Sequence, residues 1–173
     1  ASYDPSGPAV VVSRHTWTKR TELAVQAAHL DPDVPFELVG GGDRLPWVHA
    51  LDAHLHAHPE AAWTDDPAQT WRNRGTVLLP RRQRNLSFWE TSVTASGQIG
   101  PPERIGARLT IHGVVDDVAR DAAYDRASVV VAPAYLEDYG LTVLEAFARG
   151  RPVIVCDDGG GLVELVEGTG AGI

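Results

Sequence analysis

Short runs of apolar, mostly β-branched residues alternate along this chain with stretches of helical periodicity. The runs contain few polar residues, which is typical of strands that are buried on both faces of a parallel sheet. A helix between successive strands is the usual crossover of such a sheet. The runs occupy residues 9–12, 36–39, 109–112, 128–132 and 152–156. The alternation therefore predicts an α/β fold, a doubly wound parallel sheet with helices on both faces.

The expected helices begin and end at residues with clear boundary chemistry. Asp31, Pro32 and Asp33 end the first helix, Pro59 closes the second, and Asp116 or Asp117 can cap the third. The helical stretches lie at about 19–30, 45–58, 117–126, 141–149 and 161–167. Because ligands of doubly wound sheets bind beyond the carboxyl ends of the strands, the loops that follow the five strands are the candidate site.

Residues 61–108 do not fit the alternation. This stretch combines three tryptophans with an arginine cluster between Arg72 and Arg84. We interpret it as an irregular insertion within a single domain that spans 1–173, since a loop of this length in a compact domain is usually functional or mobile. The arginines could contact a phosphate or an anionic membrane surface, although charge runs of this kind usually lie in solvated loops.

Composition narrows the classes of partner. The formal charge of −8 argues against a nucleic-acid partner, which would require a basic face. The one cysteine, Cys156, allows no internal disulfide, and we read it as a core residue of the last strand. The chain contains no methionine, so Ala1 is not a natural start, and we expect one domain taken from a longer protein.

The loop after residue 132 carries the most informative chemistry. Glu137 lies on this loop, Glu145 lies in the helix that follows, and Gly140 directly precedes that helix. Free amides and the helix dipole at this point favour an anion such as a diphosphate. A carboxylate on either side can accept hydrogen bonds from the hydroxyl groups of a sugar. Two carboxylates at this spacing are common on protein surfaces. The strand, glycine and helix around them favour a ligand-binding role over that of ordinary surface charges.

Residues 137–153 resemble the Glu-x7-Glu signature of glycosyltransferase family 4, the large retaining family with the GT-B fold. Four further segments match the family's motifs in the same order. Ser13 to Arg20 is similar to the first donor loop, with Arg14 and Lys19 five residues apart. The others are 39–42 and 111–115, where the family has its next two sheet-edge loops, and 158–164, which resembles an Asp-x-Gly-Gly loop. The resemblance implies the Rossmann-like C-terminal half of a GT-B enzyme.

The resemblance also implies roles for single residues. Arg14 and Lys19 would bind the donor diphosphate, which needs no divalent metal and no further cofactor, and Glu137 would hold the sugar hydroxyls. Glu145 would hold the ribose, and backbone near Val114 and Val115 would meet the nucleobase. The catalytic set is Arg14, Lys19 and Glu137. The donor-binding set is Gly42, Val114, Val115, Asp138, Tyr139, Gly140, Leu141, Thr142 and Glu145.

The resemblance implies a hexosyltransferase-type reaction, in which a sugar moves from a nucleoside diphosphate sugar to an acceptor with retained anomeric configuration. We expect front-face attack, in which the diphosphate takes the acceptor's proton, because no carboxylate is a compelling nucleophile. The N-terminal acceptor domain of a GT-B enzyme is absent, so we expect this fragment to bind donor weakly and to be inactive. We expect a cytoplasmic protein, with membrane contact at the inner face only in the full-length enzyme.

Several alternatives remain open at this stage. The chain could be the donor half of another GT-B enzyme, a phosphorylase or an epimerase, or a non-catalytic nucleotide-sugar-binding or interaction module. The hypothesis of an NAD-binding oxidoreductase has weaker support. Leu45 replaces the third glycine of the G-x-G-x-x-G dinucleotide fingerprint that would begin at Gly40. Histidines at 49, 54, 56 and 58 suggest a metal on a solvent-facing helix, but no acidic or cysteine partner has the diagnostic spacing.

Overall fold

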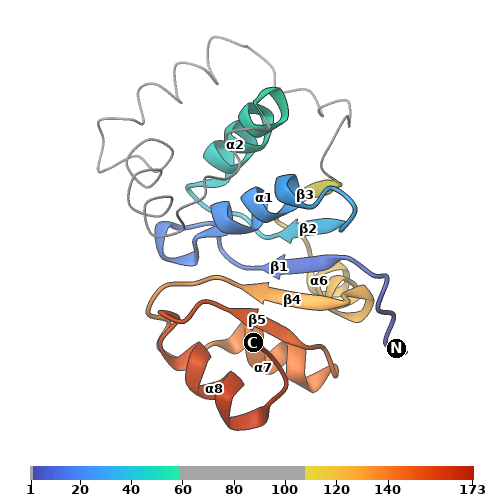
Figure 1. Cartoon of the computed structure of the whole chain (residues 1–173), viewed down its shortest axis with the longest axis vertical. Helices are drawn as coiled ribbons and strands as arrows, with labels where there is room; N and C mark the ends of the chain where they lie inside the picture. The colour runs from blue at the N-terminus through green and yellow to red at the C-terminus, as the bar shows by residue number, and fades with distance from the viewer. Residues whose placement is uncertain (1, 59–107) are drawn as a thin grey trace.

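The computed structural model describes residues 2–58 and 108–173, which form one five-stranded parallel sheet with flanking helices (Figure 1). The strands are β1 (Ala9–Val12), β2 (Phe36–Val39), β3 (Leu109–Gly113), β4 (Val129–Ala132) and β5 (Val153–Val155). Their order is β3-β2-β1-β4-β5, and every pair is parallel. All carboxyl ends therefore meet at one edge of the sheet, as the apolar runs predict.

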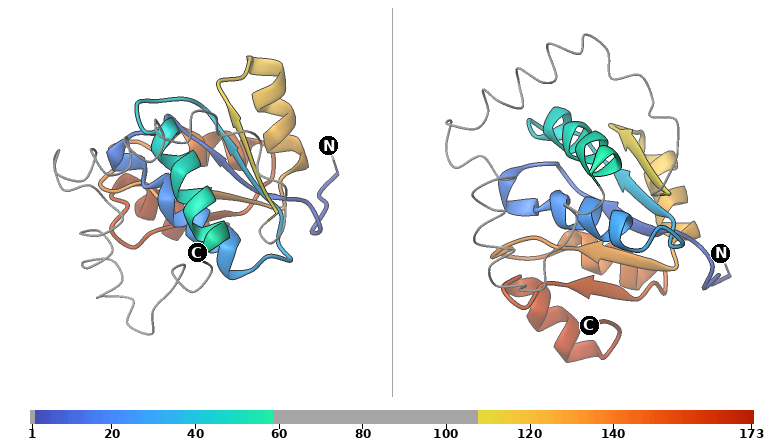
Figure 2. Two further views of the ribbon diagram at one scale, coloured as in Figure 1. Left: turned by 90° about the horizontal axis from the view of Figure 1, so that it is seen from above. Right: turned by 45° about the horizontal axis from the view of Figure 1, so that its top comes forward.

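Helices cover both faces of the sheet, which confirms the doubly wound prediction. The helices are α1 (Thr21–Leu30), α2 (Leu45–Ala57), α6 (Asp117–Arg126), α7 (Leu141–Ala148) and α8 (Gly161–Thr169). Figures 1 and 2 show α1 and α2 packed together on one face, with α6, α7 and α8 on the other. The predicted insertion at 61–108 lies outside the described residues, apart from Arg108.

Alternating side chains of the central strand divide the core into two clusters. Val11 and Leu38 are fully buried against α1 and α2, whereas Val10 and Val130 are fully buried against the helices of the opposite face. Burial of each such valine contributes about 1.5–3 kcal/mol relative to an exposed side chain. Both faces of β1 are thus apolar, which is why its sequence shows no polar alternation.

The first helix begins two residues later than its periodicity predicts. A short 3-10 helix, η1 (Trp17–Lys19), comes first, and Arg20 then adopts the left-handed conformation with φ 45° and ψ 39°. The chain therefore turns sharply between Lys19 and Thr21 before α1 starts. This turn fixes the direction in which Lys19 leaves the backbone.

The strand order places a topological switch point beside β1. β1 pairs with β2 on one side and with β4 on the other, so the connections from β1 and β4 lead to opposite faces of the sheet. The loops after β1 and β4 consequently diverge at the carboxyl edge. A crevice at such a point is the usual ligand site of a doubly wound sheet.

Candidate functional site

Two adjoining pockets lie at the carboxyl edge of the sheet. The first, of about 340 Å³, lies between the loops that follow β1 and β4. The second, of about 530 Å³, lies over the loops that follow β1, β2 and β3. Residues common to both are Val12, Ser13, Arg14 and Thr142. The two pockets therefore form one continuous crevice across the switch point.

All twelve residues singled out in the sequence line this crevice. The first pocket is lined by Arg14, Lys19, Glu137, Asp138, Tyr139, Gly140, Leu141 and Thr142. The second pocket is lined by Gly42, Val114, Val115 and Glu145, and it shares Arg14 and Thr142 with the first. Segments as far apart in the chain as Arg14 and Glu145 thus meet in one place, although their individual roles remain predictions.

Backbone hydrogen bonds join the loops beneath the second pocket. The amide of Ser13 donates to the Val39 carbonyl at 3.0 Å, and the amide of His15 donates to the Gly41 carbonyl at 2.8 Å. The amide of Gly40 donates to the Gly113 carbonyl at 2.8 Å. These bonds extend the sheet contacts past the ends of β1, β2 and β3. Arg14 is held between them with its side chain exposed to the crevice.

The N-terminus of α7 faces the first pocket. Gly140 precedes the helix in the left-handed conformation with φ 71°, which costs glycine little. A Cβ atom at this position would lie 2.4 Å from Cδ2 of Leu162, so a side chain here would require the Leu162 side chain to shift. The amides of Leu141 and Thr142 have no acceptor within the helix and can bind an anion, whereas the amides of Val143 and Leu144 donate to the Gly140 carbonyl. Thr142 fixes this turn to β1, because its hydroxyl donates to the Val12 carbonyl at 3.1 Å.

Lys19 and Glu137 form an ion pair across the first pocket. Each side chain keeps about a quarter of its surface exposed, at 27% and 26%. The cation comes from the loop after β1 and the carboxylate from the loop after β4. The pair thus lies at the switch point itself, where a ligand can reach both charges.

Glu145 is held from behind by a buried phenol. The hydroxyl of Tyr124, on α6, donates to Oε2 of Glu145 at 2.7 Å. Burial of Tyr124, together with this bond to a carboxylate, raises the pKa of the phenol far above its ordinary value. Arg120 lines the second pocket on the same side. Neither Tyr124 nor Arg120 is singled out by the sequence, because nothing in a helical pattern indicates which carboxylate a tyrosine meets.

Buried polar side chains lie behind the first loop. Burial raises the pKa of Glu22 to about 7, and the nearby Arg44 opposes this shift without cancelling it. The guanidinium of Arg44 lies 4.3 Å from the ring centre of Trp47, and burial lowers its pKa. His15 is fully buried, with its Nδ1 atom 3.0 Å from the Thr21 hydroxyl, and burial lowers the pKa of the imidazole.

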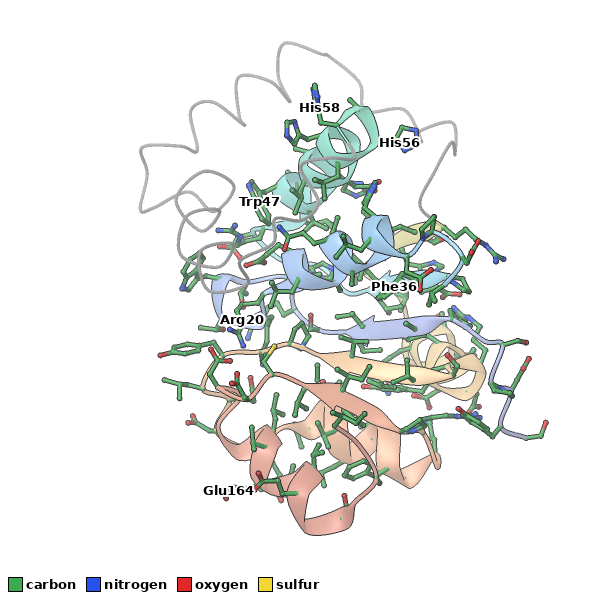
Figure 3. All side chains as sticks on the ribbon, viewed as in Figure 1. Arg20, Phe36, Trp47, His56, His58 and Glu164 are labelled. Atoms are coloured by element: carbon green, nitrogen blue, oxygen red, sulfur yellow. The ribbon has the colours of Figure 1, made fainter. Side chains whose placement is uncertain are left out.

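Four histidines lie on or just after α2, and none of them lines either pocket. Figure 3 shows His56 and His58 at the far end of this helix, remote from Arg20. One face of α2, including Trp47 and Leu51, is packed in the core, so the helix is not simply solvent-facing as we expected. Among residues 2–58 and 108–173, no group of three or more His, Cys, Asp or Glu side chains is arranged to hold a metal ion.

Two further expectations concern the last strand and membranes. Cys156 lies just after β5 and is half-buried, so it is not the core strand residue that we predicted. The strand ends one residue earlier, where the chain turns toward the loop at Asp158. Within the described part of the chain, no helix has the length and apolar character needed to span a bilayer.

The fold and the crevice together define a Rossmann-like α/β domain with a ligand site at its topological switch point. Residues 97–173 match the family model described as Glycosyl transferases group 1. This part of the chain is therefore similar to the group 1 glycosyltransferases, and the described residues have a Rossmann-like α/β fold.

Individual relatives agree with this placement. The chain is 31% identical over 150 residues to D-inositol 3-phosphate glycosyltransferase of Streptomyces bingchenggensis, a match that covers 80% of this chain and 29% of that protein. It is similar to sucrose-phosphate synthase of Thermosynechococcus elongatus, with a TM-score of 0.54, 25% identity, and coverage of 98% and 32%. A mutant of S. aureus TarM, in complex with fondaparinux, alpha-GlcNAc-glycerol and UDP, has a TM-score of 0.57, 17% identity, and coverage of 95% and 24%. The chain thus spans about a third or less of each of these proteins.

Proposed function

We propose that this chain is the donor-binding domain of a retaining family 4 glycosyltransferase, which holds a nucleoside diphosphate sugar along the crevice. The observation that carries the proposal is the meeting of Arg14, Lys19, Glu137, Glu145 and the N-terminus of α7 in two adjoining pockets. A nucleoside diphosphate sugar has one anionic centre between two hydroxyl-bearing ends. The crevice offers cations and helix amides at its centre and a carboxylate toward each end, which matches that order of charges.

In this arrangement each group of the donor meets a complementary partner. Arg14, Lys19 and the first-turn amides of α7 neutralise the diphosphate, and Glu137 binds the sugar hydroxyls. Glu145 binds the ribose diol, while backbone at Val114 and Val115 meets the nucleobase. Gly42 lets the loop after β2 approach the His15 backbone closely at the second pocket, and the segment from Asp138 to Leu141 surrounds the sugar and the diphosphate.

The same residues suit the departure of the diphosphate. Negative charge grows on the leaving oxygen as the bond to the sugar breaks, and the sugar acquires oxocarbenium character. Fixed cations and amides near that oxygen stabilise this charge most strongly when it is fully developed. We propose that no divalent metal is required and that the diphosphate accepts the acceptor's proton on the same face. Transfer itself belongs to the whole enzyme, whose other domain would bring the acceptor.

Binding of nucleotides by the 173-residue chain tests the proposal. We would titrate the ¹⁵N-labelled chain with UDP-glucose, ADP-glucose and GDP-mannose in the presence of EDTA, because amide shifts detect weak binding. We expect one of these donors to shift amides at the crevice. Arg14→Ala and Glu145→Ala should each weaken that binding about tenfold, which is the loss of about 1.4 kcal/mol.

Glu164→Ala is the matched control, since Glu164 is exposed on α8 and lines neither pocket (Figure 3). Unchanged affinity in both crevice variants would contradict the residue assignment. Binding of inorganic phosphate at the crevice without any nucleotide would instead favour a phosphorylase.

A further inference from the structure

Arg20 is a buried arginine in an unusual backbone conformation. It follows Lys19 directly, adopts φ 45°, and keeps only 3% of its surface exposed. A left-handed conformation is costly for a residue with a Cβ atom, by about 1–2 kcal/mol. Desolvation of a guanidinium adds a further cost unless its donors are satisfied. The Arg20 side chain must therefore make strong contacts that offset both costs.

The guanidinium of Arg20 joins three loops at the carboxyl edge. Its Nε donates to the Pro133 carbonyl at 2.7 Å and its Nη2 to the Ala134 carbonyl at 3.3 Å, both in the loop after β4. Nη1 donates to Oδ2 of Asp158 at 2.9 Å, and Nη2 pairs with the other carboxylate oxygen. Asp158 belongs to the loop after β5. Figure 3 shows Arg20 at this edge of the sheet.

The loop fixed by Asp158 in turn holds the backbone of Glu137. The amide of Leu136 donates to the Asp158 carbonyl at 3.0 Å, and the amide of Glu137 donates to the Gly159 carbonyl at 3.0 Å. The amide of Gly161 returns a bond to the Glu137 carbonyl at 2.8 Å. The backbone of Glu137 thus pairs with the loop after β5, much as one strand pairs with the next. The position of Glu137 relative to the sheet therefore depends on the position of that loop.

We propose that Arg20 is a positioning residue which, together with Asp158, fixes the positions of Lys19 and Glu137. It thereby determines how tightly the crevice binds the diphosphate-sugar half of the donor. Lys19 is its chain neighbour, and Glu137 is reached through the loop that Asp158 anchors. The inference rests on the proposed function, since it concerns the same crevice. It adds two residues, Arg20 and Asp158, that line neither pocket.

The hydrogen bonds that the Arg20 guanidinium makes to Pro133, Ala134 and Asp158 lie in the loops after β4 and β5. The second pocket is built on backbone bonds among the loops after β1, β2 and β3, in which no atom of the Arg20 side chain takes part. Loss of Arg20 should therefore move Lys19 and Glu137 while leaving the ribose and nucleobase end in place. If the ion pair between Arg20 and Asp158 were purely structural, its loss would instead weaken ligand binding at both ends of the crevice together. This split between the two ends distinguishes the two roles.

Three variants and one control test this split. Arg20→Gly removes the side chain but accepts the left-handed backbone, so it adds no strain. Arg20→Gln removes the charge and shortens the side chain, and Asp158→Asn removes the charge without a change in size. The matched control is Arg126→Gln, which breaks the exposed pair between Arg126 and Glu37, residues that line neither pocket.

Each variant would be titrated by ¹⁵N NMR with the donor that the unaltered chain binds best among UDP-glucose, ADP-glucose and GDP-mannose. It would also be titrated with the matching monophosphate, UMP, AMP or GMP. We expect the Arg20 and Asp158 variants to bind the sugar nucleotide about tenfold more weakly, and the monophosphate within about twofold of the unaltered chain. Arg126→Gln should match the unaltered chain for both probes.

Unchanged affinity for the sugar nucleotide in Arg20→Gly would overturn the inference, and so would an equal loss for the sugar nucleotide and the monophosphate. If the unaltered chain binds none of the probes, the proposed function fails and the inference falls with it. That result is distinct from binding that persists without sensitivity to Arg20, which refutes the positioning role alone.

Discussion

Glu22 makes the stability of this domain depend on pH in a direction opposite to that of an ordinary surface carboxylate. The carboxyl group lies behind the first loop with only 5% of the residue exposed, and burial raises its pKa from 4.5 to about 7. The folded chain therefore binds this proton more tightly than the unfolded chain does. Stability from this group is fully present below about pH 4.5 and is lost as the pH rises toward 7.

The size of the effect follows from the shift. A difference of one unit in pKa corresponds to about 1.36 kcal/mol, so the raised pKa of Glu22 amounts to roughly 3 kcal/mol over the full range. Most of this difference, about 2 to 3 kcal/mol, falls between pH 5 and pH 8. It is a large share of the stability of a typical domain.

Urea unfolding of the unaltered chain and of Glu22→Gln, followed by tryptophan fluorescence at pH 5, 6, 7 and 8, measures this effect. Burial lowers the pKa of His15, so this group changes the stability with pH in the opposite sense. The difference between the two proteins removes that contribution. The unaltered chain should lose about 2 to 3 kcal/mol relative to Glu22→Gln from pH 5 to pH 8. A difference between the two proteins that stays constant with pH would refute the reasoning.

Two further substitutions test the scaffold of the crevice. Tyr124→Phe removes the 2.7 Å bond to Glu145 and should lower the free energy of unfolding by about 1–2 kcal/mol at neutral pH. Because the raised pKa of the phenol favours its neutral form in the folded state, this difference should shrink above pH 10; a difference that persists there in urea titrations counts against the bond. Gly40→Ala would place a Cβ atom 1.9 Å from the Ser13 carbonyl oxygen at φ 131°, and should cost about 2 kcal/mol or more in thermal unfolding. Gly168→Ala, in α8 with no atom within 4 Å of the added Cβ, should stabilise the chain by up to about 1 kcal/mol, and equal effects at the two glycines would contradict the geometry.

The fold could be predicted from local patterns because its strands are buried on both faces. β1 and β2 span the residues that their apolar runs indicate, and Asp116 caps α6 by accepting a bond from the amide of Ala119. The position of the crevice followed from the same reasoning, since parallel strands bring their carboxyl ends together. Such features depend on residues close in sequence, where periodicity and capping are visible.

The polar contacts around the crevice could not be predicted in the same way. Arg20 reads as a third basic residue of the first loop, yet it is turned inward to acceptors 113 to 138 residues further along the chain. The ion pair between Lys19 and Glu137 likewise joins residues 118 positions apart. Burial of a charge is decided by whether distant loops supply partners for it, and no local pattern records that.

The central place of β1 has a consequence for how the chain acquires its structure during synthesis. β1 precedes the other described strands in the chain yet lies in the middle of the sheet, and one of its two edges pairs with Val129 and Val130 of β4. A nascent or truncated chain that stops before these residues therefore presents an apolar strand with an open edge, which is a template for pairing with other chains. N-terminal fragments of this domain should aggregate, and its folding should be completed only after β4 has left the ribosome.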